Sequence, residues 1–139
     1  FKADLAVSNP PFFHNKPKSP FHARNLARHD DALPISDLFS GVAKILSKDG
    51  VFCIVWPVER EVDLMSAAND CNFTLVRRCE ILPTKKHPPV RLLSEFKFSE
   101  QVNSEAICSK IVLETGEEKG SRNFTSEYNE LMRDFFLDA

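Results

Sequence analysis

The stretch Asp4-Leu5-Ala6-Val7-Ser8-Asn9-Pro10-Pro11-Phe12 decides which fold the chain is expected to adopt. Its apolar first half is typical of a short buried strand. The two prolines end that strand, because proline cannot donate to a sheet ladder. In an open α/β sheet, ligands bind at the carboxyl ends of the strands. The Asn-Pro-Pro-Phe sequence therefore lies where such a fold would place a site.

The sequence on the carboxyl side of this motif predicts a helix and a second buried strand. Residues 35–47 have apolar side chains at helical spacing, and Asp49-Gly50 is a typical helix end. Residues 51–56 form a continuous apolar run closed by Pro57, which suits a parallel strand covered on both faces. We expect this strand to pair in parallel with residues 5–8, with the helix as the connection.

The remaining elements extend this α/β pattern. A second helix is expected from Val58, β-rich runs cover 73–82, 90–98 and 109–115, and a final helix begins after Thr125 or Ser126. Strands that alternate with helices favour a parallel sheet flanked by helices. The closing run of strands predicts that antiparallel strands form an edge of this sheet.

The Asn-Pro-Pro-Phe motif has the residue types that methylation of a planar amine requires. An exocyclic amine on adenine is a poor nucleophile, because its lone pair is delocalised into the ring. The Asn9 side-chain oxygen and the Pro10 carbonyl could accept its two N–H bonds and localise that lone pair. Pro11 helps to fix the Pro10 carbonyl, and Phe12 offers a stacking face worth about 1–3 kcal/mol. The alternative is that Asn-Pro-Pro only ends a strand, as turn dipeptides commonly do.

Composition limits the possible classes of protein. With 139 residues, 42% of them hydrophobic and 27% charged, the chain suits one soluble domain, and a net charge of -2 predicts no polyanion partner by itself. The four cysteines form no CxxC pair and the histidines lack metal-ligand spacing, so we expect no metal. Free thiols favour a reducing compartment, hence the cytoplasm. No apolar run is long enough to predict a membrane span.

Two windows without acidic residues are candidate RNA contacts, because Lys and Arg contacts to phosphate supply most non-specific affinity for nucleic acid. The first window, between Asp4 and Asp30, holds Lys16, Lys18, Arg24 and Arg28, and the second, between Glu80 and Glu95, holds Lys85, Lys86 and Arg91. The alternative is a solvated loop with chance charge. Trp56 is expected in the core, and Arg77-Arg78 is expected to be structural.

Several segments together resemble a known family. Residues 4–13 resemble motif IV of amino-group methyltransferases. Residues 46–57, KKHPPVRLLSEF at 85–96 and FTSEYNELMRDFFL at 124–137, with Arg24 and Arg28, look like the bacterial tRNA (adenine-N6)-methyltransferases. That family modifies the adenosine beside the anticodon of a valine tRNA. The resemblance implies a Rossmann-like fold, S-adenosylmethionine as cofactor, tRNA as partner, and Asn9, Pro10, Pro11 and Phe12 as the catalytic motif.

The resemblance also implies that residues 1–139 form a single partial domain, the C-terminal half of a methyltransferase. The family's Gly-rich loop and acidic ribose ligand would lie upstream of residue 1, so only Asn9 would contribute to cofactor binding. We therefore expect the chain alone to be inactive, and its first strand to expose an edge that promotes self-association. Motif IV also allows methylation of guanine in rRNA or of protein glutamine, and the isolated chain could be a non-catalytic RNA-binding or packing module.

Overall fold

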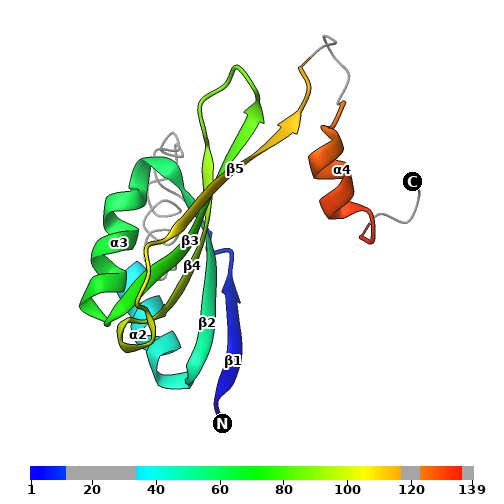
Figure 1. Cartoon of the computed structure of the whole chain (residues 1–139). Coiled ribbons are helices and arrows are strands. Elements are labelled where there is room, and N and C mark those ends of the chain that lie inside the picture. The colour runs from blue at the N-terminus through cyan, green and yellow to red at the C-terminus, as the bar shows by residue number, and fades with distance from the viewer. Residues whose placement is uncertain (12–33, 117–122, 136–139) are drawn as a thin grey trace, which may run out of the picture.

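The computed structural model describes residues 1–11, 34–116 and 123–135 (Figure 1). Phe12 and the basic residues of the first window lie outside the described residues. In chain order the elements are β1 (Ala3–Ser8), α2 (Ile35–Ile45), β2 (Leu46–Pro57), η1 (Val58–Arg60), α3 (Glu61–Asp70), β3 (Phe73–Thr84), β4 (Arg91–Phe98), η2 (Ser99–Gln101), β5 (Ile107–Glu114) and α4 (Ser126–Met132).

The five strands form one mixed sheet in the order β1-β2-β4-β3-β5. β1 and β2 are neighbours and run in parallel, with Val7 opposite Cys53 and Ser8 opposite Ile54. α2 connects them, which confirms the expected strand-helix-strand unit. β3 also runs in this direction, because β2 and β3 are both antiparallel to β4. The carboxyl ends of β1, β2 and β3 therefore lie at the same end of the sheet. We call this end the carboxyl edge, as distinct from the edge strands β1 and β5.

The position of the antiparallel strand differs from the expectation. β4 is antiparallel to both β2 and β3 and lies between them, whereas the edge strand β5 runs parallel to β3. The short connection between β3 and β4 makes an antiparallel pair, but it leaves open which strand of the pair faces β2. In this inner place, Leu92, Ser94 and Phe96 on one face of β4 are all buried.

The end of α2 also differs from the expectation. The helix ends at Ile45, and Leu46 already has extended backbone angles. The pairing with β1 then shifts register between Leu46 and Val51, so residues 46–50 are an irregular start to β2. Gly50 is required in this bulge, since an added Cβ would lie 2.6 Å from the Leu46 Cγ atom. Asp49-Gly50 therefore shapes a strand entry instead of ending a helix.

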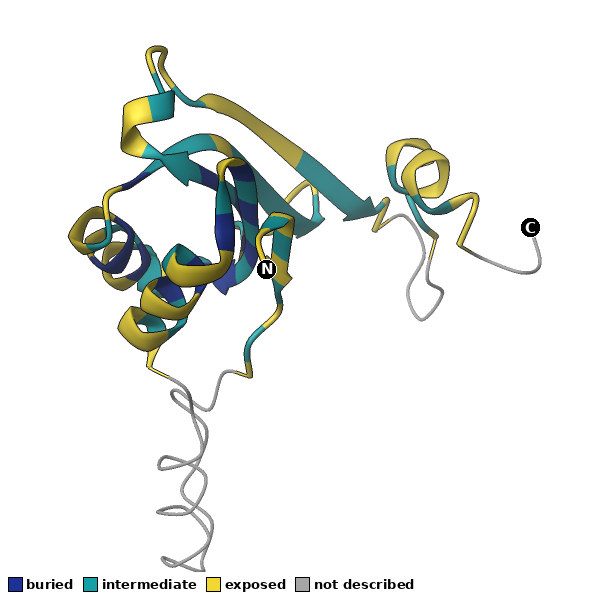
Figure 2. Cartoon of the chain, turned by 90° about the horizontal axis from the view of Figure 1, so that it is seen from below, coloured by how far each residue is buried: buried dark blue, intermediate teal, exposed yellow. Residues whose placement is uncertain are grey.

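One face of the sheet carries the core. α2 and α3 lie together on this face, as Figure 1 shows, and the buried segments of strands and helices face each other in Figure 2. Phe39 of α2 packs edge-on against Phe52 and Phe96, with ring centroids 5.2 and 5.3 Å apart. Leu64 of α3 is also fully buried. We call this side the covered face.

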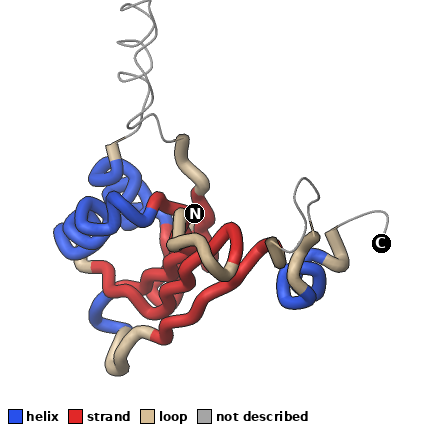
Figure 3. Tube along the Cα trace, turned by 90° about the horizontal axis from the view of Figure 1, so that it is seen from above, coloured by secondary structure: helices blue, strands red, loops and turns tan. Residues whose placement is uncertain are grey.

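The other side, which we call the open face, exposes apolar side chains. Leu5, Val7, Leu93 and Ile107 keep 59%, 70%, 39% and 66% of their surface exposed. α4 stands beside the far end of β5, away from α2 and α3 (Figure 3). It is held there by Thr125, whose Oγ1 donates to the Val112 carbonyl and accepts from the Tyr128 N–H. A cleft of about 580 Å³ lies between the sheet and α4.

Candidate active site at the carboxyl edge of the sheet

The Asn-Pro-Pro segment follows β1 directly at the carboxyl edge. Ser8 is the last residue of β1 and lies opposite Ile54, two residues before Trp56. Asn9 and Pro11 are exposed, and Pro10 is half-buried. The chain therefore leaves the sheet beside the end of β2 with the Asn9 side chain accessible, as a group that contacts a substrate must be.

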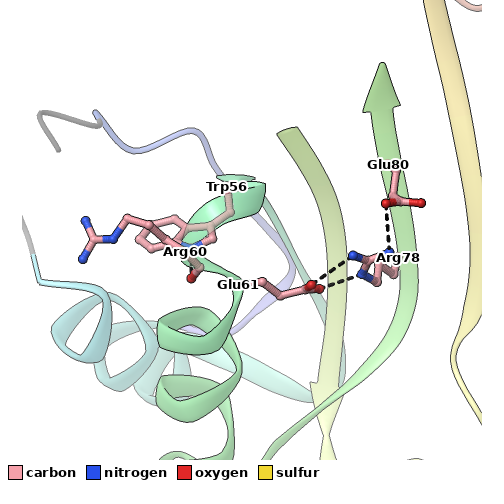
Figure 4. A network of polar contacts seen from close by, with 5 residues as sticks. All are labelled: Trp56, Arg60, Glu61, Arg78 and Glu80. Atoms are coloured by element: carbon pink, nitrogen blue, oxygen red, sulfur yellow. Dashed lines mark hydrogen bonds and ion pairs between the residues drawn. The ribbon is translucent and has the colours of Figure 1, made fainter. Parts of the chain in front are cut away.

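Beside this segment, Trp56 is enclosed by the turn that follows β2. Only 5% of Trp56 is exposed, which confirms its expected place in the core. Its indole Nε1 donates to the Arg60 carbonyl at 2.7 Å, and the Arg60 guanidinium lies 5.8 Å from the ring centroid. Arg60 also binds the Asp63 carboxylate, at 3.1 Å from Nη2, and Figure 4 shows how Arg60 lies against the indole. Arg60 thus fixes the turn against the indole with both its backbone carbonyl and its side chain.

A bidentate ion pair continues from this turn to β3. Arg78 donates from Nε and Nη2 to the Glu61 carboxylate at 2.6 and 2.9 Å, and its Nη1 lies 3.7 Å from the Glu80 carboxylate (Figure 4). The hydrogen bond to Glu61 is the main cause that raises the pKa of the Arg78 guanidinium above its ordinary value. Arg78 is structural, as expected, and Glu61 is its partner on α3.

The second basic window forms the connection between β3 and β4. Lys85, Lys86 and Arg91 are exposed. The turn is closed by backbone bonds from His87 N to Thr84 O at 3.1 Å and from Val90 N to Ile81 O at 2.9 Å. Arg91 lies opposite Pro57 at the end of β2. These cations consequently share the carboxyl edge with Asn9, because they lie at the ends of β4 and β3, two and three strand positions from β1.

Sequence reasoning missed the residues that join these parts. Arg60 carries one local signal, an acidic residue three positions later that can pair with it on a helix. The pair between Glu61 and Arg78 spans 17 residues and two elements, so no local pattern indicates it. Within the described residues, no group of three metal-ligating side chains occurs, and no helix is long and apolar enough to cross a membrane.

Comparison with solved structures identifies the fold. A predicted O-methyltransferase from Agrobacterium tumefaciens matches with a TM-score of 0.61 over 94% of this chain and 50% of that chain. The mixed sheet therefore has the same Rossmann-like fold as part of that protein, and at 16% identity the likeness shows the fold alone. No protein-family model matches the sequence.

Comparison with curated proteins gives closer relatives. The chain is 35% identical over 98% of its length to a Bacteroides thetaiotaomicron protein, and 34% identical over 96% to one from Trichodesmium erythraeum. Both are named tRNA1(Val) (adenine(37)-N6)-methyltransferase. The chain covers 54% and 53% of these two proteins, so it spans about half the length of the curated relatives it matches. Along almost all of its length, the chain is thus a homologue of one half of proteins that carry this name.

Proposed function

We propose that the full-length protein with this segment transfers a methyl group to the N6 amine of an adenine in tRNA. One observation carries the proposal. The Asn-Pro-Pro segment, which has the residue types of amino methylation, directly follows β1 at the carboxyl edge with Asn9 exposed. The names of the relatives support tRNA as the substrate and the N6 position as the acceptor.

Asn9 and Pro10 would act on the amine nitrogen. The Asn9 side-chain oxygen and the Pro10 carbonyl each accept one N–H of the amine, which localises its lone pair. Pro10 and Pro11 have fixed φ angles, so the carbonyl is held before the substrate arrives. Phe12 would stack on the base. As the nitrogen bonds to the methyl carbon, it becomes positive and releases a proton to solvent, so no strong base is needed.

S-adenosylmethionine would supply the electrophilic methyl carbon, and its bond from methyl carbon to sulfur would break as the new bond forms. Among the residues of this chain, Asn9 suits contact with the donor, because its exposed amide lies at the ligand-binding edge of the sheet. The four glycines are dispersed at 41, 50, 116 and 120, so the sequence contains no Gly-rich cofactor turn. We infer that the other cofactor-binding residues lie outside residues 1–139.

We infer further that this chain is one part of a methyltransferase domain and that another part of the domain packs on it. The exposed apolar side chains of the open face support this interpretation, because parallel strands in α/β proteins are normally covered on both faces. Among the described elements, β1 has a strand on one side only. In the isolated chain, the unpaired side of β1 would promote self-association.

The exposed cations at the carboxyl edge would contact tRNA. Lys85 and Lys86 lie in the turn between β3 and β4, and Arg91 follows at the start of β4. Phosphate contacts position a nucleic acid without reading its sequence. Lys16, Lys18, Arg24 and Arg28 belong to the same proposal from their sequence alone. In this proposal Asn9 acts in the methyl transfer, and the lysines contribute to tRNA affinity.

The decisive experiment is single-turnover methylation of tRNA by the full-length protein, with labelled methyl donor and nucleoside analysis. Asn9→Ala should slow the reaction about 10²–10³-fold, as expected for loss of one preorganised electrostatic partner, while tRNA affinity is retained. Asn103→Ala is the matched control, because Asn103 is also exposed but precedes β5 at the opposite edge. An Asn9→Ala rate above about a tenth of wild type, or label in guanine or glutamine, would contradict the proposal.

The same protein tests the RNA contacts. Replacing Lys85 and Lys86 together by Ala should weaken tRNA binding and reduce the slope of affinity against salt by about 2, one for each phosphate that is no longer bound. Lys44 and Lys48 are the control pair, because both are exposed and lie at the opposite end of β2. An equal change of slope in the two pairs would assign the effect to net charge.

A further inference from the structure

The single tryptophan of the chain lies beside the candidate catalytic segment. Trp56 follows Ile54 by two residues on β2, and Ile54 is opposite Ser8, the residue before Asn9. Neighbouring strands are only about 4.8 Å apart. Trp56 therefore lies on the strand next to β1, two residues beyond the last residue of β2 that pairs with β1.

The turn Val58–Arg60 fixes the indole on its other side. Its first residue donates its backbone N–H to the Val90 carbonyl at 3.3 Å, and its last residue accepts from the indole N–H at 2.7 Å. The Arg60 side chain returns over the ring. The turn consequently links the end of β2 to the start of β4 and controls where Trp56 can lie.

The next residue, Glu61, is fixed by Arg78 on β3. The two hydrogen bonds, 2.6 and 2.9 Å long, form the bidentate arrangement that restricts both distance and orientation. The side chains of Arg78 and Glu61 are 22% and 29% exposed, so the pair is only partly screened by solvent. Figure 4 shows the resulting continuous path of Trp56, Arg60, Glu61 and Arg78.

We propose that Glu61 and Arg78 are positioning residues for the reaction, acting through the turn and Trp56 on the Asn-Pro-Pro segment. The functional part of this inference rests on the proposed methyl transfer. Neither residue touches the substrate in this proposal. Their pair fixes the turn, the turn fixes the indole, and the indole supports the backbone that presents the Asn9 side chain and the Pro10 carbonyl.

The 139-residue chain provides a direct test, because its tryptophan fluorescence, excited at a wavelength that Tyr128 does not absorb, reports Trp56 alone. Arg78→Ala and the milder Glu61→Gln should shift Trp56 emission to longer wavelength and increase its quenching by acrylamide. Circular dichroism should show retained secondary structure. Arg77→Ala is the matched control, since Arg77 is the adjacent residue and is also ion-paired, to Glu95 at 3.5 Å, but points to the open face. Unchanged Trp56 emission and quenching in both test variants, or an equal shift in the control, would overturn the proposal.

The full-length protein tests the consequence for catalysis. Arg78→Ala should lower the single-turnover rate on the order of 10- to 100-fold, the loss expected from a small misplacement of reacting groups, with the tRNA dissociation constant unchanged. The exchange Glu61→Arg with Arg78→Glu should restore part of the rate and the Trp56 emission. An unchanged rate, or a loss that appears only in tRNA affinity, would overturn the positioning role.

The two arms separate this inference from the proposed function. If wild-type full-length protein methylates no tRNA, the proposed function fails, and with it the catalytic consequence assigned to Arg78. The fluorescence of the short chain still decides whether Arg78 positions Trp56. If wild type is active and Asn9→Ala is inactive but Arg78→Ala is fully active, the function stands and this inference fails.

Discussion

The two faces of the sheet differ sharply although the same strands build both. On the covered face, Phe52, Phe96 and Leu92 are completely buried. On the open face, Val7 and Leu93 expose much of their apolar surface. Residues adjacent along β4 thus have opposite environments, because successive side chains of a strand point to opposite faces.

This difference separates what stabilises the chain from what the chain contributes to a larger assembly. Burial of apolar surface contributes roughly 25 cal/mol per Å², so the covered face supplies most of the stability. Exposed valine and leucine contribute little until something packs on them. The open face also holds the ion pair of Arg77 and Glu95 beside Cys53. A partner for this face must therefore accommodate charge as well as apolar surface.

Truncation of a covered-face side chain should have the largest effect on stability. Phe96→Ala removes a fully buried ring that packs on Phe39, and should lower the free energy of unfolding by about 3–5 kcal/mol. Leu93→Ala, three positions earlier on the open face, should cost about 1 kcal/mol, because Leu93 is only partly buried. Urea unfolding of the 139-residue chain measures both. Equal losses would mean that the two faces do not differ energetically.

The elements with local signals were predictable from the sequence. The pairing of β1 with β2 through α2 follows from apolar periodicity and from the prolines that end each strand. Thr125 or Ser126 was predicted as the N-cap of α4, and the structure selects Thr125, whose side chain accepts from the Tyr128 N–H at 3.1 Å. The apolar run of β2 was predicted to be covered on both faces. In this chain its alternate residues Phe52, Ile54 and Trp56 are buried, whereas Cys53 and Val55 are only half-buried.

The sequence-based predictions that were wrong concern features that depend on long-range packing. The sequence of β4 cannot indicate that it inserts between β2 and β3, because antiparallel pairing to β3 is equally compatible with an edge position. Gly50 looks like a helix end, and only the buried Leu46 beside it explains the bulge. At the candidate site, Asn9 was predicted from its motif, and the structure shows only that it is exposed directly after β1. Glu61 could not be found, since its partner Arg78 is distant in sequence.

A charge on β1, which has a neighbouring strand on one side only among the described elements, should reduce self-association of the isolated chain. Val7→Lys places a cation on β1, where lysine discourages edge pairing, and should lower the association constant by at least about tenfold, or about 1.4 kcal/mol. Val62→Lys on α3 is the control, because Val62 is 82% exposed but belongs to the helix layer. Sedimentation equilibrium measures both. A wild-type chain that stays monomeric at high concentration would refute the proposed edge contact.

The reactivity of the Cys53 thiol should report whether another part of the protein packs on the open face. Burial, and then the negative charge of Glu95, raise the pKa of Cys53, while Arg77 opposes this shift. A raised pKa leaves less thiolate at a given pH, so Cys53 should react with iodoacetamide more slowly than the exposed Cys108. As the pH is raised, the rate at Cys53 should keep increasing beyond the pH range in which ordinary cysteine thiols ionise. Glu95→Gln should lower the pKa and accelerate the reaction.

The same thiol distinguishes the isolated chain from the full-length protein. If another part of the domain covers the open face, Cys53 should become unreactive in the full-length protein under native conditions. Mass spectrometry after timed labelling gives the modified fraction at each cysteine, with urea-unfolded protein as the reference. Equal Cys53 rates in the two proteins would leave the open face uncovered and contradict the proposed domain arrangement.

The smallest effect is expected at Ser94, where the covered face departs from apolar packing. Ser94 is 2% exposed in the central strand β4, and its hydroxyl oxygen has no hydrogen-bond partner among the described residues. Its strand neighbours are Ile54 and Arg78, and the guanidinium of Arg78 binds Glu61.

A buried hydroxyl without a partner costs about 1–3 kcal/mol, whereas removing the Ser94 oxygen atom leaves only a small void. Ser94→Ala should therefore raise the free energy of unfolding by up to about 1 kcal/mol. Ser109→Ala, at an exposed position of β5, should change it by less than about 0.5 kcal/mol. Urea unfolding with an unchanged slope is the measurement. A loss of stability in Ser94→Ala would show that this hydroxyl makes a favourable bond in solution, and the covered face would then rest on a polar contact as well as on apolar burial.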